Sequence, residues 1–259
     1  MSELLKEDPT ATATKAKLEV IGFGLENCMI AQQAGAHRIE LCDNPVDGGT
    51  TPSFGLIVEA RKKLHIALYT MIRPRGGDFL YTNAEFEIMK ADVLLCKRSG
   101  CDGVVTGILT ADGKVDKTRS RILVDLAYPM GVTFHRAFDR TENAFESLQD
   151  IIDCGFERIL TSGQKNNAME GSELIRKLIH QADGRISIMP GSGVRSDNIL
   201  PLAHSTGASE FHTSARTSKA GGMTYHNKYL DENQDIISVD SQEIQHLLQN
   251  LTSLQTSLK

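Results

Sequence analysis

The sequence predicts an α/β protein folded as a single (β/α)8 TIM barrel. Its 259 residues are close to the roughly 250 that one such barrel uses. Short β-rich runs alternate with longer helical patterns, which is typical of βα units and a parallel sheet. The eight β-rich runs are evenly spaced, and this spacing favours a barrel over the alternative, a doubly wound open sheet.

We expect a disordered N-terminal tail over residues 1–16, because MSELLKEDPTATATKA lacks periodicity and is rich in Thr and Ala. The barrel domain then spans residues 17–259. The β-rich runs predict strands at 18–23, 37–42, 66–72, 102–106, 131–135, 157–161, 185–189 and 208–213. The patterns between and after them predict helices at 25–34, 52–64, 84–98, 119–127, 142–154, 169–181, 197–202 and 241–254.

Local signals support these elements. Thr82 and Glu85 form a T-x-x-E capping box before the helix at 84–98. Pro52, behind Thr51 as N-cap, fits the first turn of the helix at 52–64. A glycine lies between helix and strand at four places, which suggests a repeat of two βα units. These glycines are Gly35, Gly100, Gly155 and Gly207.

The composition limits which partners and which cellular compartment we expect for this protein. With 28 basic and 33 acidic residues the net charge is -5, so we expect neither a nucleic-acid nor a membrane partner. The sequence has no run of 18 apolar residues and no secretory pattern at its start, and its five cysteines form no C-x-x-C pair. We therefore expect a cytoplasmic protein with reduced thiols. Four of these cysteines are assigned to packing, namely Cys28, Cys96, Cys101 and Cys154.

Two late strand ends predict an anion site. The run RISIMPGSG ends in a Gly-Ser-Gly turn that opens a helix, and ASEFHTSAR ends in Thr-Ser-Ala-Arg. Late strands of TIM barrels hold phosphate on such loop pairs, because free backbone N–H groups face the ligand. The predicted anion-binding residues in these loops are Gly191, Gly193, Ser214 and Arg216.

Arginines after two earlier strands extend this site. RPRGGDF contributes Arg73 and Arg75, and FHRAFD contributes Arg136. A cluster of guanidinium groups beside N–H-rich turns favours a phosphate or carboxylate ligand. Each arginine has an alternative role, which is to pair with a neighbouring carboxylate.

Glu40 and His135 are the candidate catalytic residues. Glu40 and Cys42 point the same way along a strand. If they face the barrel interior, Glu40 is either a general base or the partner of an interior arginine. His135 is a general acid, a donor that orients the ligand, or a core histidine. His212 is assigned a structural role. The loop CDNPVDGGTTPS either folds over the end of the barrel as a lid or only caps it.

Six motifs resemble the CutC copper homeostasis family. They are RIELCDNPVDGGTTPS, MIRPRGGDFLYT, TFHRAFD, GFERILTSG, MPGSGV and EFHTSAR, and the resemblance extends from about residue 18 to residue 225. It implies a TIM barrel that is cytoplasmic, homo-oligomeric, and involved in copper tolerance or trafficking through Cu(I) bound by cysteine.

The resemblance carries over one metal ligand, Cys42. Relatives with two proposed copper cysteines have the other in a string similar to MEVCVDS, where this chain has Ile21. Some relatives also have Cys where this chain has Thr213. Because Cu(I) prefers two or three soft ligands, a tight site here needs Met71, a histidine, or Cys42 of another subunit.

Two functions follow. The first is copper homeostasis with Cu(I) bound at Cys42. The second is a TIM-barrel enzyme that acts on a small phosphorylated or carboxylated metabolite, with Glu40 as base, His135 as acid, and the arginines and glycine turns holding the anion. The sequence leaves open whether the protein is catalytic.

Overall fold

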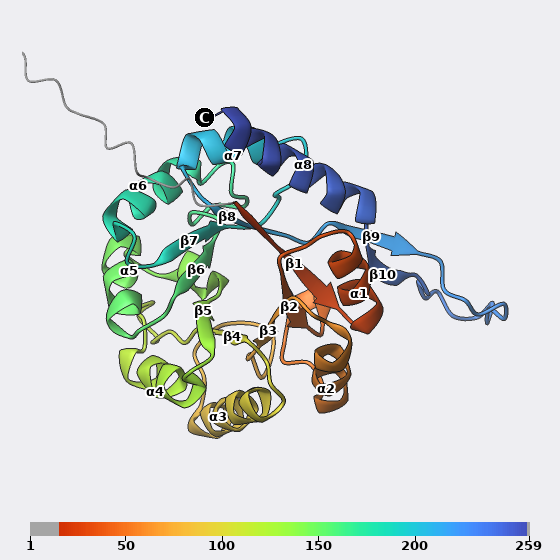
Figure 1. Ribbon diagram of the computed structural model, residues 1–259. Coiled ribbons are helices and arrows are strands. Elements are labelled where there is room, and N and C mark those ends of the chain that lie inside the picture. Colours follow the sequence, from red (N-terminus) through yellow and green to blue (C-terminus); the bar gives the residue numbers. More distant parts are fainter. Residues whose placement is uncertain (1–15, 258–259) are drawn as a thin grey trace, which may run out of the picture.

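The computed structural model describes residues 16–257, with side chains to residue 254, and its centre is a barrel of eight parallel strands (Figure 1). The predicted tail over 1–16 lies, except for Ala16, outside the described residues. The strands are β1 (Lys17–Phe23), β2 (Arg38–Cys42), β3 (Ala67–Met71), β4 (Gly103–Thr106), β5 (Gly131–Phe134), β6 (Arg158–Thr161), β7 (Ser187–Pro190) and β8 (Glu210–Thr213). The predicted fold class is confirmed.

The sheet is ordered so that neighbours in sequence are neighbours in space. It runs β7-β6-β5-β4-β3-β2-β1-β8, and every pair along it is parallel. β8 pairs with β1, with His212 opposite Glu19. β7 lies next to β8, so the sheet comes close to full closure. All eight strands therefore end on the same side, which we call the barrel mouth.

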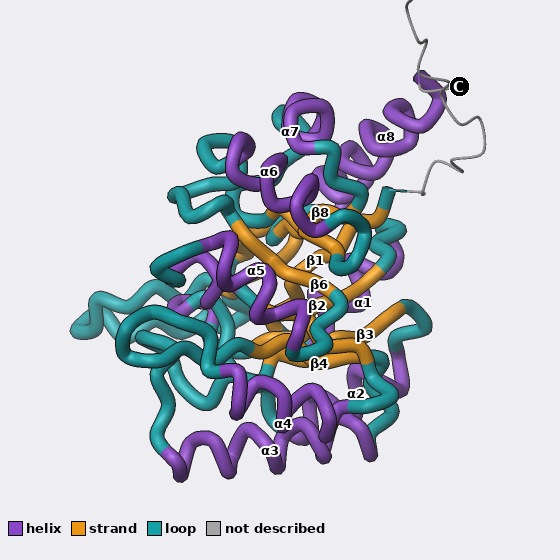
Figure 2. The backbone as a smooth tube through the Cα atoms, turned by 90° about the vertical axis from the view of Figure 1, so that its left-hand side faces the viewer, coloured by secondary structure: helices purple, strands orange, loops and turns teal. Residues whose placement is uncertain are grey.

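Helices form an outer ring around the strands (Figures 1 and 2). They are α1 (Leu25–Gln33), α2 (Phe54–Lys63), α3 (Asn83–Arg98), α4 (Lys117–Ala127), α5 (Ala144–Asp153), α6 (Ser172–Ala182), α7 (Ile199–Thr206) and α8 (Ser241–Ser257). Two 3-10 helices, η1 (Pro45–Asp47) and η2 (Arg136–Arg140), lie in loops at the mouth. The apolar faces of the outer helices bury a continuous core against the sheet.

Most local signals are confirmed, and one is wrong. Thr82 and Glu85 form the reciprocal capping box. The four repeated glycines all have positive φ, between 74° and 101°, at helix C-termini. The wrong signal is Pro52, because α2 begins at Phe54 and the hydroxyl of Ser53 accepts its capping hydrogen bond from Leu56 N. Ser53 takes the N-cap position in place of the predicted Thr51, because its hydroxyl can accept from an N–H that has no partner within the helix.

The sequence also missed an arm, residues 216–239. It contains the antiparallel strands β9 (Arg216–Lys219) and β10 (Ile236–Val239) and extends away from the barrel (Figure 1). Four large apolar side chains of the arm loop are exposed, namely Met223, Tyr225, Tyr229 and Leu230. A polar loop of more than ten residues between two short strands gives too weak a periodic signal to predict.

Candidate functional site

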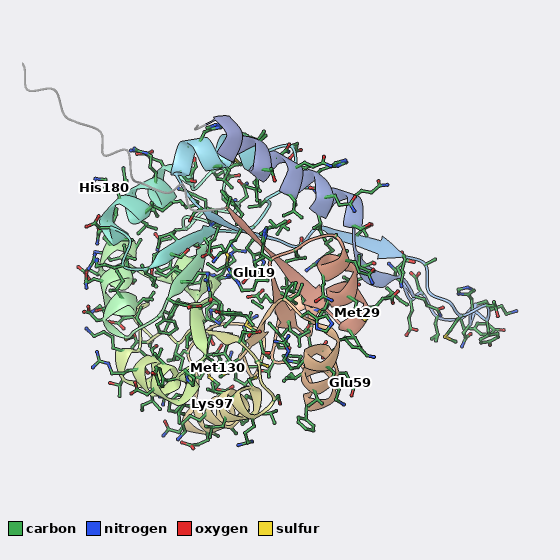
Figure 3. All side chains as sticks on the ribbon, viewed as in Figure 1. Glu19, Met29, Glu59, Lys97, Met130 and His180 are labelled. Atoms are coloured by element: carbon green, nitrogen blue, oxygen red, sulfur yellow. The ribbon has the colours of Figure 1, made fainter. Side chains whose placement is uncertain are left out.

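A cavity of about 260 Å³ opens at the barrel mouth. It lies above a barrel interior that is filled with side chains, and Figure 3 shows Glu19 near the middle of the ring while Lys97 and His180 lie on the outer helices. The cavity is lined by residues from the barrel strands or the loops after them. These residues are Ile21, Glu40, Gly48, Met71, Arg73, Phe79, His135, Arg136, Leu160, Ser192, Gly193, His212, Thr213, Ser214 and Arg216.

Seven of the ten predicted site residues line this cavity. They are Glu40, Arg73, His135, Arg136, Gly193, Ser214 and Arg216. Cys42, Arg75 and Gly191 do not line it. A side chain at Gly191 would collide with Leu160 and lie 3.2 Å from His212 Cβ, so this glycine is needed where β7 packs closely against its neighbours.

Arg73 is a buried cation at the cavity wall. Its side chain donates to three backbone carbonyls, those of Asp47 at 2.7 Å, Gly49 at 2.8 Å and Gly77 at 3.0 Å. Only 6% of the residue is exposed. Among the described residues no carboxylate forms an ion pair with it, and its Nε has no hydrogen-bond partner. A buried positive charge without a counter-ion attracts an anion.

The contacts of Arg73 fix the lid loop, residues 43–53. The backbone of Asp43 pairs with that of Thr50 in a short bridge. The guanidinium of Arg73 donates to the carbonyls of Asp47 and Gly49, which lie between Asp43 and Thr50 in the loop. Gly48 of this loop lines the cavity, so the loop reaches the mouth as the lid alternative requires.

Arg75 has the alternative role, pairing with carboxylates. Its Nε donates to Glu85 Oε1 at 2.6 Å, and its Nη2 lies 3.0 Å from Asp78 Oδ1. Its guanidinium also lies over the Tyr81 ring. The structure therefore separates Arg75 from the predicted anion-binding set, because α3 presents Glu85 to it.

Arg136 and Arg216 lie at the edge of the cavity. Arg136 donates to Asp139 Oδ2 at 2.8 Å and to Ser162 Oγ at 3.0 Å, so its charge is already paired. Arg216 lies over the Phe23 ring, 5.2 Å from its centroid, and is exposed. Within residues 16–257 no ion pair is found for Arg216, which leaves its charge available at the entrance.

Backbone strain gathers in the loops at the mouth. Five described residues other than glycine have positive φ, and four of them follow barrel strands. These four are Asn44 after β2, Gln164 after β6, Ser192 after β7 and Ala215 after β8. Such conformations cost about 1–3 kcal/mol each and gather at functional sites. Ser192 and Ala215 lie in the two loops that the sequence predicted to hold an anion.

His135 is a neutral donor in this environment. Burial, together with the charge of Arg73, lowers the pKa of His135 to about 3. Its Nδ1 accepts a hydrogen bond from Ala137 N at 3.2 Å, so the proton of the neutral ring is on Nε2. In the described part of the chain, Nε2 is buried without a partner. Of the three predicted roles, the geometry favours the donor that orients a ligand.

Glu40 is a buried carboxyl inside the barrel. It lines the cavity, and burial raises its pKa to about 7, with the charge of Glu19 contributing in the same direction. One oxygen, Oε1, is without a partner among the described residues. Within residues 16–257 no interior arginine is within ion-pair distance of Glu40, since Arg38 pairs with Glu19 and Glu210 instead.

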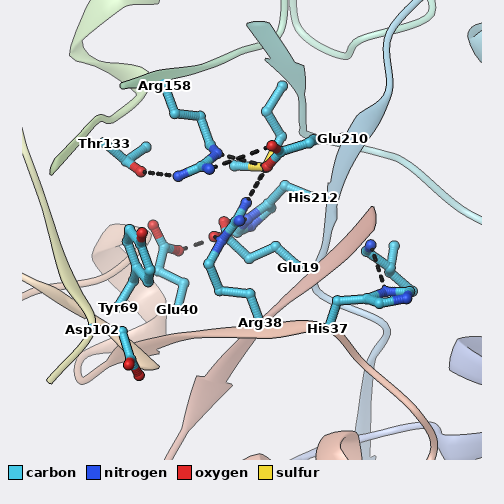
Figure 4. Close-up of polar contacts among 12 residues, drawn as sticks. Glu19, His37, Arg38, Glu40, Tyr69, Asp102, Thr133, Arg158, Glu210 and His212 are labelled. Atoms are coloured by element: carbon cyan, nitrogen blue, oxygen red, sulfur yellow. Dashed lines mark hydrogen bonds and ion pairs between the residues drawn. The ribbon is translucent and has the colours of Figure 1, made fainter. Parts of the chain in front are cut away.

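His212 faces the same cavity and is held by Glu19. Its Nδ1 lies 2.7 Å from Glu19 Oε1, and its Nε2 lies 3.9 Å from Glu40 Oε2 (Figure 4). Glu19 also accepts from Arg38 Nε. Burial alone would lower the pKa of His212, but its hydrogen bond to Glu19 and the charges of Glu40 and Glu19 raise it overall.

Glu19 and His212 were not among the predicted site residues. One signal could have found His212, which is the alternation of β8. Its sequence Glu-Phe-His-Thr puts His212 on the same face as Glu210, and Phe211 on the outer face. Two ionisable residues at alternate positions of a buried strand indicate a polar barrel interior.

Cys42 lies in an apolar cluster beside the cavity. The cluster contains Ile21, Tyr69, Met71 and Val105, all on inward-facing strand positions. An added Cβ at Gly49 would lie 3.0 Å from Cys42 Sγ and 3.6 Å from Met71 Cε, so the two sulfur side chains meet near one point. Burial, followed by the charges of Glu40 and Glu19, raises the pKa of the Cys42 thiol well above its usual value. A bound cation would therefore have to displace its proton.

Two groups could hold a metal ion. Cys42 and Met71 offer the soft sulfur ligands that Cu(I) prefers. Glu19, Glu40 and His212 each offer a ligand atom, and these atoms lie within 4.8 Å of one another. In that trio Glu19 already accepts from Arg38 and His212, so it is less available to a cation.

Comparison with known proteins gives consistent matches. A model of the CutC family matches residues 16–217. A family protein CutC from Chromobacterium violaceum is 52% identical over 208 residues, which are 80% of this chain and 84% of that protein. The copper homeostasis protein cutC homolog of Mus musculus is 47% identical over 210 residues, which are 81% of this chain and 77% of that protein.

A solved structure shows the same architecture. The crystal structure of a CutC protein from Streptococcus agalactiae has a TM-score of 0.74 and 35% sequence identity, and the match covers 77% of this chain and 98% of that chain. Within residues 16–257 every helix is too short or too polar to cross a membrane.

Proposed function

This chain belongs to the CutC family, whose mouse and human relatives are named for copper homeostasis, and on that premise we propose two functions for its barrel mouth. The first is the binding and turnover of a small phosphorylated or carboxylated metabolite, which the geometry supports best. The second is the binding of Cu(I) at Cys42 in copper tolerance or trafficking, which the family name supports.

One observation carries the metabolite proposal. Three buried polar atoms belong to residues that line the same cavity, and among the described residues none has a hydrogen-bond partner. They are Arg73 Nε, His135 Nε2 and Glu40 Oε1. More than about 90% of buried polar groups in proteins have a partner, so three in one cavity indicate groups that a ligand satisfies. Two are donors, on a cation and a neutral imidazole, which suits an anion.

Ligand binding tests this proposal. Calorimetric titration with inorganic phosphate and with glycerol 3-phosphate should give saturable binding that weakens at least tenfold in Arg216→Ala. The matched control is Arg75→Ala, because Arg75 lies outside the cavity and should leave affinity unchanged. Equal loss in both variants, or no binding of phosphorylated and carboxylated compounds by the wild type, would contradict a specific anion site.

The copper proposal rests on the two sulfur side chains. Cys42 and Met71 lie together inside the barrel, where a Cu(I) ion and a thiolate would neutralise each other's charge. Because Ile21 occupies the position of a second family cysteine, the protein supplies one thiolate per chain to this site. In this role copper is cargo rather than a resident cofactor.

Anaerobic Cu(I) titration against a chromophoric chelator tests the copper site. The wild type should bind one tight equivalent per chain, and Cys42→Ser should lose it. Cys154→Ser is the control, because that buried thiol lies at the end of α5, outside the apolar cluster that contains Cys42 and Met71. Equal affinity in wild type and Cys42→Ser would remove Cys42 as a ligand.

We also propose that the protein is cytoplasmic and homo-oligomeric. Five buried, unpaired cysteines suit a reducing compartment. The exposed apolar side chains of the arm, such as Tyr225 and Tyr229, suit a contact with another copy. Light scattering of the wild type and of Tyr225→Ser/Tyr229→Ser should show a smaller mass for the variant, and a monomeric wild type would refute the oligomer.

A further inference from the structure

We propose that His212 and Glu40 together bind a hydroxyl group of the ligand, with Glu19 as the positioning residue, so that the cavity selects small anions that carry a hydroxyl. This inference rests on the proposed metabolite site and adds the substrate class, namely hydroxy acids and polyol phosphates. It gives His212 a ligand contact in place of the structural role expected from the sequence.

Glu19 fixes the orientation of the imidazole. Its Oε1 lies 2.7 Å from His212 Nδ1, and its other oxygen accepts from Arg38 Nε. The charge of Arg38 and the contact with His212 overcome the opposing effect of burial and hold the pKa of Glu19 well below its usual value. An ionised Glu19 accepts, so Nδ1 carries a proton and Nε2 is directed away from Glu19.

His212 and Glu40 lie close enough for one ligand group to bridge them. His212 Nε2 and Glu40 Oε2 are 3.9 Å apart, which is too far for a hydrogen bond. Glu40 Oε1 also has no partner in the described residues. A hydroxyl both donates and accepts, so it can satisfy the carboxyl and the imidazole at once. When one of the pair donates and the other accepts, as with a protonated His212 and an ionised Glu40, a carbonyl or an ammonium can satisfy only one of them.

The leading charged neighbours of His212 lie on two strands. Glu19 on β1 and Glu40 and Arg38 on β2 have the largest effects on its pKa. On the β7 side it faces Gly191, where any side chain would approach its Cβ. The imidazole therefore lies between two carboxyls and a neutral wall, and its Nε2 is the atom left to meet a ligand.

The size of the cavity limits the ligand. A volume of about 260 Å³ lies near the lower end of the range for ligand pockets in proteins, which begins at about 300 Å³. It suits a small ligand, such as a three-carbon phosphate. With its anionic group near Arg73 or Arg216, such a ligand extends toward Glu40 and His212, since all four line one cavity.

Paired ligands test the hydroxyl preference in the wild-type protein. Glycerol 3-phosphate is compared with n-propyl phosphate, and glycerate with propionate, by titration calorimetry with inorganic phosphate as the reference anion. We expect the hydroxylated member of at least one pair to bind more than about tenfold tighter, because hydrogen bonds to charged groups are stronger than those between neutral groups.

Two variants at His212 separate a ligand contact from a structural role. An Asn side chain can keep the bond to Glu19 but has no atom at the Nε2 position, whereas Gln can place its amide there. His212→Asn should lose the preference for the hydroxyl and keep its affinity for inorganic phosphate. His212→Gln should retain part of the preference.

The outcomes distinguish the two proposals. If the wild type binds inorganic phosphate and both members of each pair equally, the hydroxyl inference is refuted and the anion site stands. If neither phosphate nor any of these ligands binds, the metabolite proposal fails and the inference fails with it. If His212→Asn keeps the full preference, His212 does not contact the hydroxyl.

Discussion

Burial changes the protonation of two side chains that line the cavity. It raises the pKa of Glu40 to about 7 and lowers that of His135 to about 3, where the charge of Arg73 adds to the effect. Near neutral pH, His135 is therefore uncharged and Glu40 is close to its midpoint. Perturbed groups of this kind are more common at functional sites than elsewhere.

Glu40 should make stability depend on pH. Its pKa rises from 4.5 to about 7 on folding, so the folded protein holds this proton more tightly. The resulting stability is complete below pH 4.5 and is lost as the pH rises through 7. Glu40→Gln should therefore gain stability relative to wild type across this range, by up to about 3 kcal/mol.

Urea unfolding at several pH values between 4.5 and 8 measures this difference. Glu59→Gln is the control, because the exposed Glu59 is paired with Lys62 and its pKa is lowered, not raised. A Glu40→Gln difference that stays flat with pH would show that Glu40 is not perturbed.

Arg73 should keep the lid loop closed. A lysine retains the charge but cannot donate to the carbonyls of Asp47, Gly49 and Gly77 together. In Arg73→Lys the amides of Asp43 and Thr50, which pair across the loop, should exchange at least about tenfold faster, which corresponds to about 1.4 kcal/mol. Hydrogen–deuterium exchange measures this, and Arg75→Lys should leave these amides unchanged.

At the residue scale, the sequence predicted seven of the residues that line the cavity but could not predict the contacts of particular side chains. Arg73 and Arg136 were placed correctly at the mouth. Arg75 was grouped with them, because nothing local reveals that Glu85 approaches it from α3. The contacts of His212 with Glu19 and Glu40 could not be predicted, because the two carboxyls belong to strands about 170 or more residues away in sequence.

At the scale of elements, the strands and helices were predictable because their signals are local. Apolar runs predicted all eight barrel strands, and glycines with positive φ end four of the helices. The starts of α2, α5, α6 and α7 were predicted two or three residues too early. The arm was missed because its strands are short and mostly exposed, so no hydrophobic pattern marks them.

Substituting a glycine that ends a helix tests whether its positive φ contributes to stability. Gly207 has φ 74° and open space where a Cβ would lie, so Gly207→Ala changes only the backbone preference. It should destabilise the protein by about 1 kcal/mol. Gly55 also has open space but lies within α2 without a positive φ, so Gly55→Ala should be neutral or stabilising by up to about 1 kcal/mol. Thermal unfolding that shows equal effects for both would contradict this assignment.

At the scale of the whole molecule, an ionic network fills the barrel below the cavity. Arg38 connects Glu19 of β1 to Glu210 of β8, and Arg158 of β6 donates to the same Glu210 (Figure 4). The network thus joins strands on both sides of the place where the sheet comes close to closure. It also holds the carboxylate that orients His212, so the packing of the barrel and the geometry of the site depend on the same residues.

Removing Arg38 should weaken the packing of the barrel and disturb the geometry of the site. Arg38→Met leaves Glu19 and Glu210 buried without this partner, and breaking such a pair costs about 3–5 kcal/mol. Denaturant unfolding should show this loss, while Lys177→Met, which removes an exposed pair with Glu173, should leave stability unchanged within error. A loss in Arg38→Met no larger than in the control would mean that the network is not a stabilising part of the fold.

The central claim is that the cavity at the barrel mouth holds a small hydroxylated anion, and a crystal structure with glycerol 3-phosphate tests it most directly. We predict density in the cavity lined by Arg73, His135 and His212, with the anionic group near a guanidinium and a hydroxyl between His212 Nε2 and Glu40. Density confined to the outer surface, or a cavity that holds only water at saturating ligand, would contradict the account.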